Sequence, residues 1–317
     1  MADSIAKLAL DWHRCGRGAV IATVVETWGS APRVTGSQMV VDRAGGMMGS
    51  VSGGCVEGAV VLEAADVLQT GAGKLLTYGV SDADAFAVGL ACGGTIRILI
   101  QPVQDDAVLQ TLVAAETEGR AMALVTDLHD LHTQLAALND PIVAERMRSD
   151  QSGIDSGRFI AVHNPQLRLI VVGAVHIAQS LMTMARLCEY SAVLIDPRTA
   201  FGAAARFPDE HILSDWPDAA LSALRPDARA AIVTLTHDPK LDDPALAYAL
   251  RSKAFYIGCL GSRRTHAKRL ERLTAAGFSA DDLARLHAPV GLNIGARNPA
   301  EIALSIMAQI TSVLRQG

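Results

Sequence analysis

Apolar and polar positions in the first part of the chain follow two different periods. Residues 1–18 set charged side chains among apolar ones at helical spacing, which predicts an amphipathic helix. Residues 55–71 predict a second helix, and Gly71 stands where that helix would stop. Short runs rich in β-branched residues predict strands, with a glycine-rich turn at 45–54. These strands are AVIATVVET (19–27), SQMVVD (37–42), KLLTY (74–78) and TIRILIQPV (95–103).

The pattern changes in the middle of the chain. Residues 145–166 lose the apolar periodicity and gather Ser, Gly, Asp, Asn and Pro, which is typical of a connection between domains. From LRLIVVGAV onward, short apolar runs alternate with helical patterns, which predicts a parallel sheet wound with helices. We therefore expect an α/β protein with the boundary near Asn164. An α+β domain would cover residues 1–164, and a Rossmann-like parallel-sheet domain would cover residues 165–317.

Composition supports two buried cores and narrows the class of protein. The 317 residues are 50% hydrophobic and 19% charged, with a formal net charge of −5, so we expect no nucleic-acid partner. No run approaches the roughly 18 apolar residues that a spanning helix needs, so we expect no membrane insertion. The charged N-terminal helix lacks the apolar core of a signal peptide, and a cytoplasmic location is the expectation.

Two of the five cysteines stand beside glycine pairs. The number is odd and CxxC spacing is absent, which argues against a disulfide framework and a zinc knuckle. We expect Cys55 in the first turn of a helix, where unpaired backbone amides and the helix dipole stabilise a reactive or metal-binding thiolate. The glycines would let a bulky anion approach main-chain N–H groups. The two sets are Gly53-Gly54-Cys55 and Cys92-Gly93-Gly94.

A structural role is the alternative for each of these residues. Buried cysteines are common without any chemistry, and Cys15, Cys188 and Cys259 are expected in the core. Glu57 is expected to pair with the same helix start in which Cys55 is expected.

A damaged dinucleotide fingerprint opens the second half. GAVHIA, from Gly173 through His176 to Ala178, matches GxGxxG/A at its first and third key positions. Val175 replaces the second glycine and fills the space of the pyrophosphate, although a phosphate could still meet the helix N-terminus. Asp196 stands 23 positions after Gly173, close to the roughly 20 expected for an acid that binds a ribose hydroxyl. A simple Asp-Pro turn explains the same residue equally well.

Three further segments are expected at the carboxyl edge of the parallel sheet, where α/β folds bind ligands. His237 could contact a ligand or merely finish a strand, and Asn293 belongs to a glycine-bordered loop. Arg263 and Arg264 follow a serine at a helix start and could bind a phosphate, or could be a solvated helix start. The segments are THDP (236–239), GSRR (261–264) and GLNIGAR (291–297).

Many ordered motifs together resemble the XdhC/CoxI family, over a match from about Gly29 to Ile310. They are GSAPRVTGSQMVV, GSVSGGCVEG, ACGGTIRILI, LIVVGAVHIAQSL, VLIDPR, TLTHDPKLDDPAL, YIGCLGSRRTHAKRL and HAPVGLNIGARNPAEIALSI. Relatives commonly read GAGH where this chain has Val175, and GLDIGA where it has Asn293.

This resemblance implies a maturation factor for molybdenum hydroxylases such as xanthine dehydrogenase and carbon monoxide dehydrogenase. Such proteins are understood to bind the molybdenum cofactor, to protect it while a cysteine desulfurase helps to install its terminal sulfur, and to deliver it to the apoenzyme. The resemblance also implies an XdhC-type N-terminal domain, a Rossmann C-terminal domain and a homodimer.

The resemblance also supplies expected contacts for molybdopterin or its dinucleotide form, and no catalytic residue. Cys55 and Cys92 would bind the metal end from two glycine-lined loops, and the phosphate or nucleotide tail would lie on the Rossmann side. The expected cofactor contacts are Cys55, Cys92, Gly53, Gly54, Gly93, Gly94, Gly173, His176, Asp196, His237, Arg263 and Asn293. The alternatives are an NAD(P)-dependent oxidoreductase using Asp196 and His237, and an adaptor that docks a desulfurase to a hydroxylase.

Overall fold

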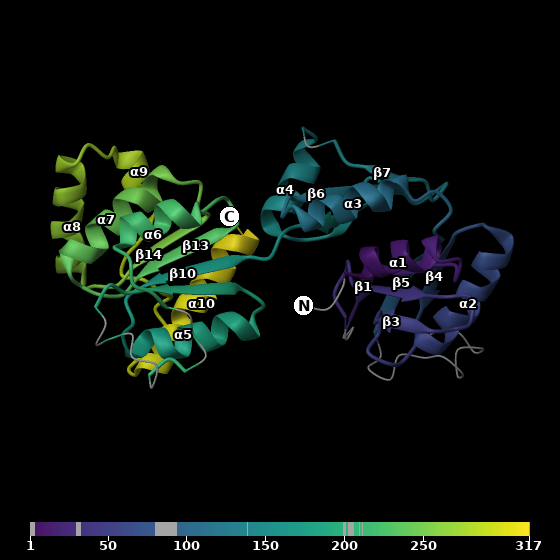
Figure 1. The fold of residues 1–317 in the computed structure, drawn as a ribbon, viewed down its shortest axis with the longest axis horizontal. Coiled ribbons are helices and arrows are strands. Elements are labelled where there is room, and N and C mark those ends of the chain that lie inside the picture. The colour runs from purple at the N-terminus through teal and green to yellow at the C-terminus, as the bar shows by residue number, and fades with distance from the viewer. Residues whose placement is uncertain are drawn as a thin grey trace. The chain divides into compact units, whose positions relative to one another are not determined.

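The chain divides into two compact units, residues 1–165 and 166–317 (Figure 1). The computed structural model describes residues 4–29, 33–79, 94–137, 139–198, 201, 206–208, 210 and 212–316.

The first unit contains an antiparallel sheet of five strands in the order β3-β2-β1-β5-β4. Side chains of β1 alternate between its two faces. Val20, Ala22 and Val24 lie in the core that also contains the apolar side chains of α2, whereas Ile21 and Val25 face α1 and α3. The elements are β1 (Val20–Trp28), β2 (Gln38–Val41), β3 (Met47–Gly49), β4 (Lys74–Tyr78), β5 (Thr95–Pro102), α1 (Ile5–Arg14), α2 (Glu57–Thr70) and α3 (Ala107–Thr117).

The glycine-rich segment at 45–54 is more than the predicted turn, because it contains the edge strand β3. Met48 of β3 lies opposite Val40 of β2, so backbone pairing forms a strand although all three residues of β3 are exposed. The predicted helix after Cys55 is confirmed. It ends at Gly71, whose left-handed φ of 72° closes α2.

A second antiparallel sheet, in the order β7-β6-β9-β8, completes the first unit. The prediction of a bare connection at 145–166 is wrong, because this segment holds β8 and β9. Its polar residues form a two-residue hairpin turn at Ser156-Gly157, both with positive φ, while Phe159 and Ile160 are buried. The elements are β6 (Met122–Asp127), β7 (Thr133–Leu135), α4 (Pro141–Ser149), β8 (Gly153–Asp155) and β9 (Arg158–His163).

The second unit is the predicted Rossmann-like domain, with six parallel strands in the order β12-β11-β10-β13-β14-β15. Its strands are β10 (Arg168–Val172), β11 (Ser191–Ile195), β12 (Ile212–Leu213), β13 (Ala230–Thr234), β14 (Tyr256–Cys259) and β15 (Leu286–His287). Its helices are α5 (His176–Leu187), α6 (Pro217–Leu224), α7 (Pro239–Arg251), α8 (Arg263–Ala275), α9 (Ala280–Ala284) and α10 (Pro299–Gln316).

Helices cover both faces of this parallel sheet (Figure 1). Leu169 and Val171 of β10 join the core under α5 and α10, whereas Ile170 and Val172 join the core under α6 and α7. The chain leaves β10 toward β11 and later returns to β13 on the other side, so the strand order reverses between β10 and β13. Loops at the carboxyl ends of these strands form the edge where such folds bind ligands.

Candidate functional site

The loop of residues 50–56, here called the Glu57 loop, is built around the carboxylate of Glu57, the first residue of α2. Glu57 is only 5% exposed. Backbone N–H groups of Val51, Ser52 and Gly54 donate hydrogen bonds to this carboxylate, at 3.1, 2.9 and 2.9 Å. The hydroxyls of Ser50 and Ser52 donate to it as well.

These donors keep Glu57 ionised although it is buried. Burial alone would raise the pKa of Glu57, but the hydrogen bonds from Ser52, Ser50 and the backbone outweigh it and lower the pKa from 4.5 to about 2. Glu57 was expected to pair with the start of the helix, but its carboxylate instead accepts from the loop that precedes the helix.

The position of Cys55 differs from the prediction. It lies outside α2, because the helix begins at Glu57 with Val56 as its N-cap, so the expected place in the first turn is wrong. Glu57 is the first residue of the helix, and its carboxylate accepts hydrogen bonds from the loop before it. The Cys55 side chain is half-buried, and it packs against the core of the five-stranded sheet.

The glycines beside Cys55 have their N–H groups engaged within the loop. Gly53 N–H donates to Ser50 Oγ at 2.9 Å, and Gly54 N–H donates to Glu57. An anion that used these N–H groups would have to displace the serine or the glutamate. Both glycines have positive φ, and a side chain added at Gly54 or Gly58 would meet no atom of the described residues within 4 Å. Within the part of the chain that the structure describes, the backbone surface around Cys55 is therefore open to a bulky ligand.

The second glycine-bordered cysteine, Cys92, lies outside the described residues together with Gly93. Gly94 is described, and it is buried just before β5. A metal site formed by Cys55 and Cys92 therefore stays a prediction. Within the described ranges, no group of three or more His, Cys, Asp and Glu side chains is arranged to bind a metal ion.

The other cysteines split between core and surface. Cys259 is buried as expected, but Cys15 and Cys188 are exposed, so the prediction for these two is wrong. Each of them is the C-cap residue of a helix, α1 and α5 respectively.

In the Rossmann-like unit, Gly173 and Asp196 meet at the carboxyl edge of the sheet. Gly173 has a φ of 113°, and a Cβ there would lie 2.7 Å from Thr236 Cγ2, so only glycine fits beside the loop after β13. The neighbouring Ala174 N–H donates to Asp196 Oδ2 at 2.8 Å. The loops after β10, β11 and β13 are thereby packed together.

The carboxylate of Asp196 is fully engaged. It is 1% exposed, and Arg198 donates to it through the backbone N–H and two side-chain nitrogens at 2.8 to 2.9 Å. Burial opposes its charge, but Arg198 and the backbone donors outweigh this effect and lower the pKa of Asp196. A ribose hydroxyl at Asp196 would have to replace one of these bonds. The predicted Asp-Pro-Arg turn is present, with Arg198 N–H bonded to Asp196.

The remaining predicted cofactor contacts in this unit are exposed, and they come from separate segments of the chain. His176 begins α5, Arg263 begins α8, and Asn293 lies in the segment between β15 and α10. His237 has a left-handed φ of 61° just before α7. A helix cap precedes α10, since Glu301 N–H donates to Asn298 Oδ1.

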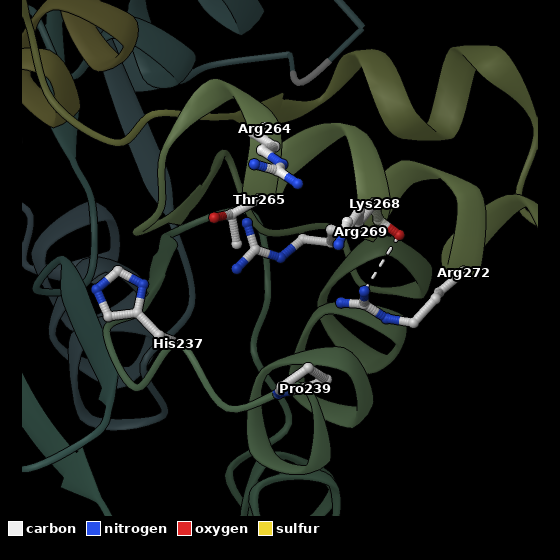
Figure 2. Close-up of a pocket in the computed structure, with 7 residues that line it drawn as sticks. All are labelled: His237, Pro239, Arg264, Thr265, Lys268, Arg269 and Arg272. Atoms are coloured by element: carbon white, nitrogen blue, oxygen red, sulfur yellow. Dashed lines mark hydrogen bonds between the residues drawn. The ribbon is translucent and has the colours of Figure 1, made fainter.

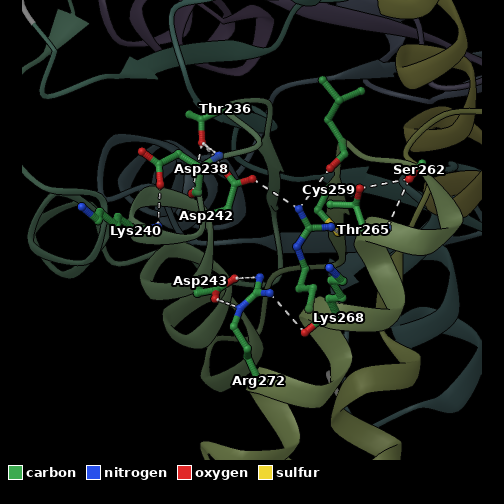
Figure 3. A network of polar contacts seen from close by, with 12 residues as sticks. Thr236, Asp238, Lys240, Asp242, Asp243, Cys259, Ser262, Thr265, Lys268 and Arg272 are labelled. Carbon is green, nitrogen blue, oxygen red and sulfur yellow. Dashed lines mark hydrogen bonds and ion pairs between the residues drawn. The ribbon is translucent and has the colours of Figure 1, made fainter.

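A buried polar network joins the ends of β13 and β14 to α7 and α8 (Figure 3). Thr236 Oγ1 donates to Asp242 at 2.6 Å, and Arg269 pairs with the other oxygen of Asp242 at 3.3 Å. Arg269 also donates to Cys259 Sγ and to the carbonyl of Leu260. Burial raises the pKa of Asp242, and burial raises the pKa of Cys259 to about 11, so Cys259 stays a neutral thiol.

Next to this network lies a basic pocket of about 230 Å³, here called the α8 pocket (Figure 2). Its lining residues are His237, Pro239, Arg264, Thr265, Lys268, Arg269 and Arg272. Sequence reasoning found His237 and Arg264 but missed Lys268 and Arg272. The missed signal is the spacing i, i+4, i+8 of three cations, which places them on one face of a helix. Arg263, which was expected to bind the cofactor, is not among the lining residues.

None of the described helices is both long and apolar enough to cross a membrane.

The chain matches two family descriptions in the order of its units. Residues 12–79 match the XdhC and CoxI family, and residues 169–310 match the XdhC Rossmann domain.

Similar proteins cover nearly the whole chain. The molybdenum cofactor insertion chaperone PaoD of Escherichia coli is 31% identical over 98% of this chain and 88% of its own length. A probable xanthine dehydrogenase subunit of Bacillus subtilis is 27% identical over 92% of each chain. A crystal structure from Bacillus halodurans described as a xanthine dehydrogenase has 26% identity and a TM-score of 0.69, and the match covers 99% of this chain and 96% of that one. The chain belongs to the XdhC and CoxI family.

Proposed function

We propose that this protein binds the molybdenum cofactor and inserts it into a molybdenum hydroxylase of the xanthine dehydrogenase type, acting as a chaperone and not as an enzyme. The observation that carries the proposal is the similarity to PaoD, which extends over 98% of the chain and therefore includes both units. The name of the Bacillus subtilis relative points to the same class of client.

The Glu57 loop fits a role in holding this cargo. None of the described residues fills the space next to Gly54 and Gly58, so a bulky ligand can approach the backbone there, beside the partly exposed Cys55 sulfur. The ionised Glu57 fixes the loop through five donor groups, so the sulfur is presented from a preformed surface. In this proposal Cys55 contacts the metal end of the cofactor, and Cys92 is its partner.

The finer parts of the proposal come from the family resemblance. The protein would hold the cofactor, as molybdopterin or its dinucleotide, while a cysteine desulfurase supplies the terminal sulfur. Carbon monoxide dehydrogenase would be a second class of client, and a homodimer would be the working assembly. Co-purification with the desulfurase and the mass measured by sedimentation equilibrium test these parts separately.

Co-expression with a molybdenum hydroxylase tests the main proposal. The purified chain should carry molybdenum and pterin, measured together by mass spectrometry. The variant Cys55→Ala should retain less of both, whereas Cys188→Ala, which removes an exposed cysteine from the other unit, should retain as much as the wild type. Wild-type protein without molybdenum or pterin would contradict the proposal, and equal retention in both variants would remove Cys55 from the contact surface.

A further inference from the structure

The α8 pocket opens at the carboxyl edge of the parallel sheet, between the loop after β13 and the first three turns of α8 (Figure 2). His237 and Pro239 form one side, and Arg264, Lys268 and Arg272 project from α8 on the other. Pockets that enclose a whole drug-sized ligand are about 300–1,000 Å³. At about 230 Å³, this pocket fits a small group of a larger ligand, or a small ion.

Some of the cationic side chains of the pocket already form an ion pair with an acidic residue, and others do not. Arg269 pairs with Asp242, and Arg272 pairs with both carboxylate oxygens of Asp243. Arg264 and Lys268 are exposed, and neither forms an ion pair with any residue of the described ranges. Two positive charges on one helix face are therefore left for a ligand.

The pocket is supported from beneath. Arg269 is 2% exposed, and its Nη atoms bond to Asp242, Cys259 and Leu260. Its buried Nε has no hydrogen-bond partner within the described residues, so the donors of Arg269 are not all satisfied. Burial and the charge of Arg269 also lower the pKa of His266 on the same helix. The potential beside the first turns of α8 is therefore positive.

The start of α8 adds to this potential. Ser262 is the N-cap and accepts a hydrogen bond from Thr265 N–H, while Arg264 and Thr265 lie in the first turn. The helix spans 13 residues, so its dipole favours negative charge at this end. The backbone and the side chains thus attract the same kind of ligand.

We propose that the α8 pocket binds a phosphate-bearing ligand, with Arg264 and Lys268 as its direct charge partners. A carboxylate carries one charge, whereas a phosphate or diphosphate carries two or more and matches two unpaired cations. Arg269 acts as a positioning residue, because its bonds fix the pocket floor and it is almost completely buried. The assignment moves the phosphate contact from Arg263 to Arg264 and Lys268, which line the pocket on the same helix.

This inference deepens the proposed function, on which the identity of the ligand rests. The phosphate or nucleotide end of the molybdenum cofactor is one source of the bound group, and a free nucleotide or inorganic diphosphate is another. The charge pattern of the pocket is the same for each source, so the site can be tested without the cofactor.

Calorimetric titration of the full-length protein with inorganic diphosphate tests the site. Saturable binding is expected, and Arg264→Gln or Lys268→Met should each weaken it about tenfold, since each removes one charge-assisted contact. Lys253→Met is the matched control, because Lys253 is exposed and follows α7 at the opposite edge of the sheet. This control should bind diphosphate like the wild type.

Adenosine diphosphate in a second titration distinguishes the sources. Binding at least as tight as that of diphosphate, and equally dependent on Lys268, would assign the site to a nucleotide, whereas binding of diphosphate alone would assign it to a smaller phosphate group. No saturable binding of either probe, or equal effects of Lys268→Met and Lys253→Met, would overturn the inference.

The result is separable from that of the proposed function. Diphosphate binding through Lys268 in a protein that never carries pterin would keep the site and reject the chaperone role. Retention of molybdenum and pterin without any diphosphate binding would reject the site and keep the chaperone role.

Discussion

The Glu57 loop and the α8 pocket both have features that suit anions, but they differ in what already occupies them. In the Glu57 loop, the carboxylate of Glu57 binds the N–H groups that an anion would need. At the Rossmann fingerprint, Asp196 binds Ala174 N–H in the same way. In the α8 pocket, Arg264 and Lys268 have no acidic partner among the described residues. The N–H groups of the two glycine loops therefore already have carboxylate partners, and the charge available for an anion lies on α8.

The largest expected effect comes from removing the acid under the α8 pocket. Asp242→Ala leaves Arg269 buried without its carboxylate, which should cost about 3–5 kcal/mol and lower the unfolding temperature by about 10 °C. Asp243→Ala is the matched control, because it breaks the more exposed pair with Arg272 and should cost less than about 1 kcal/mol. Calorimetry of the full chain measures both. Similar losses of stability in the two variants would contradict the role of the Asp242–Arg269 pair in supporting the pocket.

A smaller and local loss of stability is expected from a substitution in the Glu57 loop. Glu57→Gln replaces an acceptor of five donors by an amide that carries donors itself, which should cost about 2 kcal/mol. Amides of residues 50–56 should then exchange faster with deuterium. Glu63→Gln, which removes the partly exposed ion pair between Glu63 of α2 and Lys74 of β4, should leave their exchange unchanged. Unchanged exchange in Glu57→Gln would mean that the loop is held by something else.

At low pH the fold should lose the stabilisation that the ionised Glu57 carboxylate provides. The folded pKa of about 2 lies below the ordinary 4.5, so the ionised group stabilises the fold above about pH 4.5, and this contribution is lost as the pH falls toward 2. The difference in unfolding temperature between the wild type and Glu57→Gln should therefore be constant above about pH 5 and shrink below it. A difference that stays constant down to pH 2 would show that the charge of Glu57 is not what stabilises the loop.

The smallest expected effect is in NADH binding. Val175 occupies the place of the second fingerprint glycine, and Asp196 is held by Ala174 and Arg198. Titration followed by NADH fluorescence should give no saturable change at micromolar concentrations. Val175→Gly should not restore binding, since the acid stays occupied. Saturable binding to the wild type would revive the oxidoreductase alternative.

Local patterns in the sequence predicted most of the architecture. The alternating apolar runs indicated the parallel sheet, and Gly71 marked the end of α2. The β8-β9 hairpin was missed because β8 has only three residues and the turn residues are the same ones that fill connections. The edge strand β3 was missed because its exposed residues gain their conformation from pairing with β2.

The candidate sites were harder to predict, because their chemistry depends on partners distant in sequence. The sequence places Asp196 suitably for a ribose but does not reveal that Ala174 and Arg198 already bind it. The Arg264 to Arg272 spacing was visible, but the pairing of Arg272 with Asp243 comes from the packing of α7 against α8. Only the structure shows which cations remain unpaired.

Hydrogen exchange of the wild-type protein with and without inorganic diphosphate measures the difference between the two regions most directly. The account predicts added protection in peptides covering residues 236–240 and 262–272, with no change at residues 50–58. Protection that appears at residues 50–58 and not on α8 would contradict it.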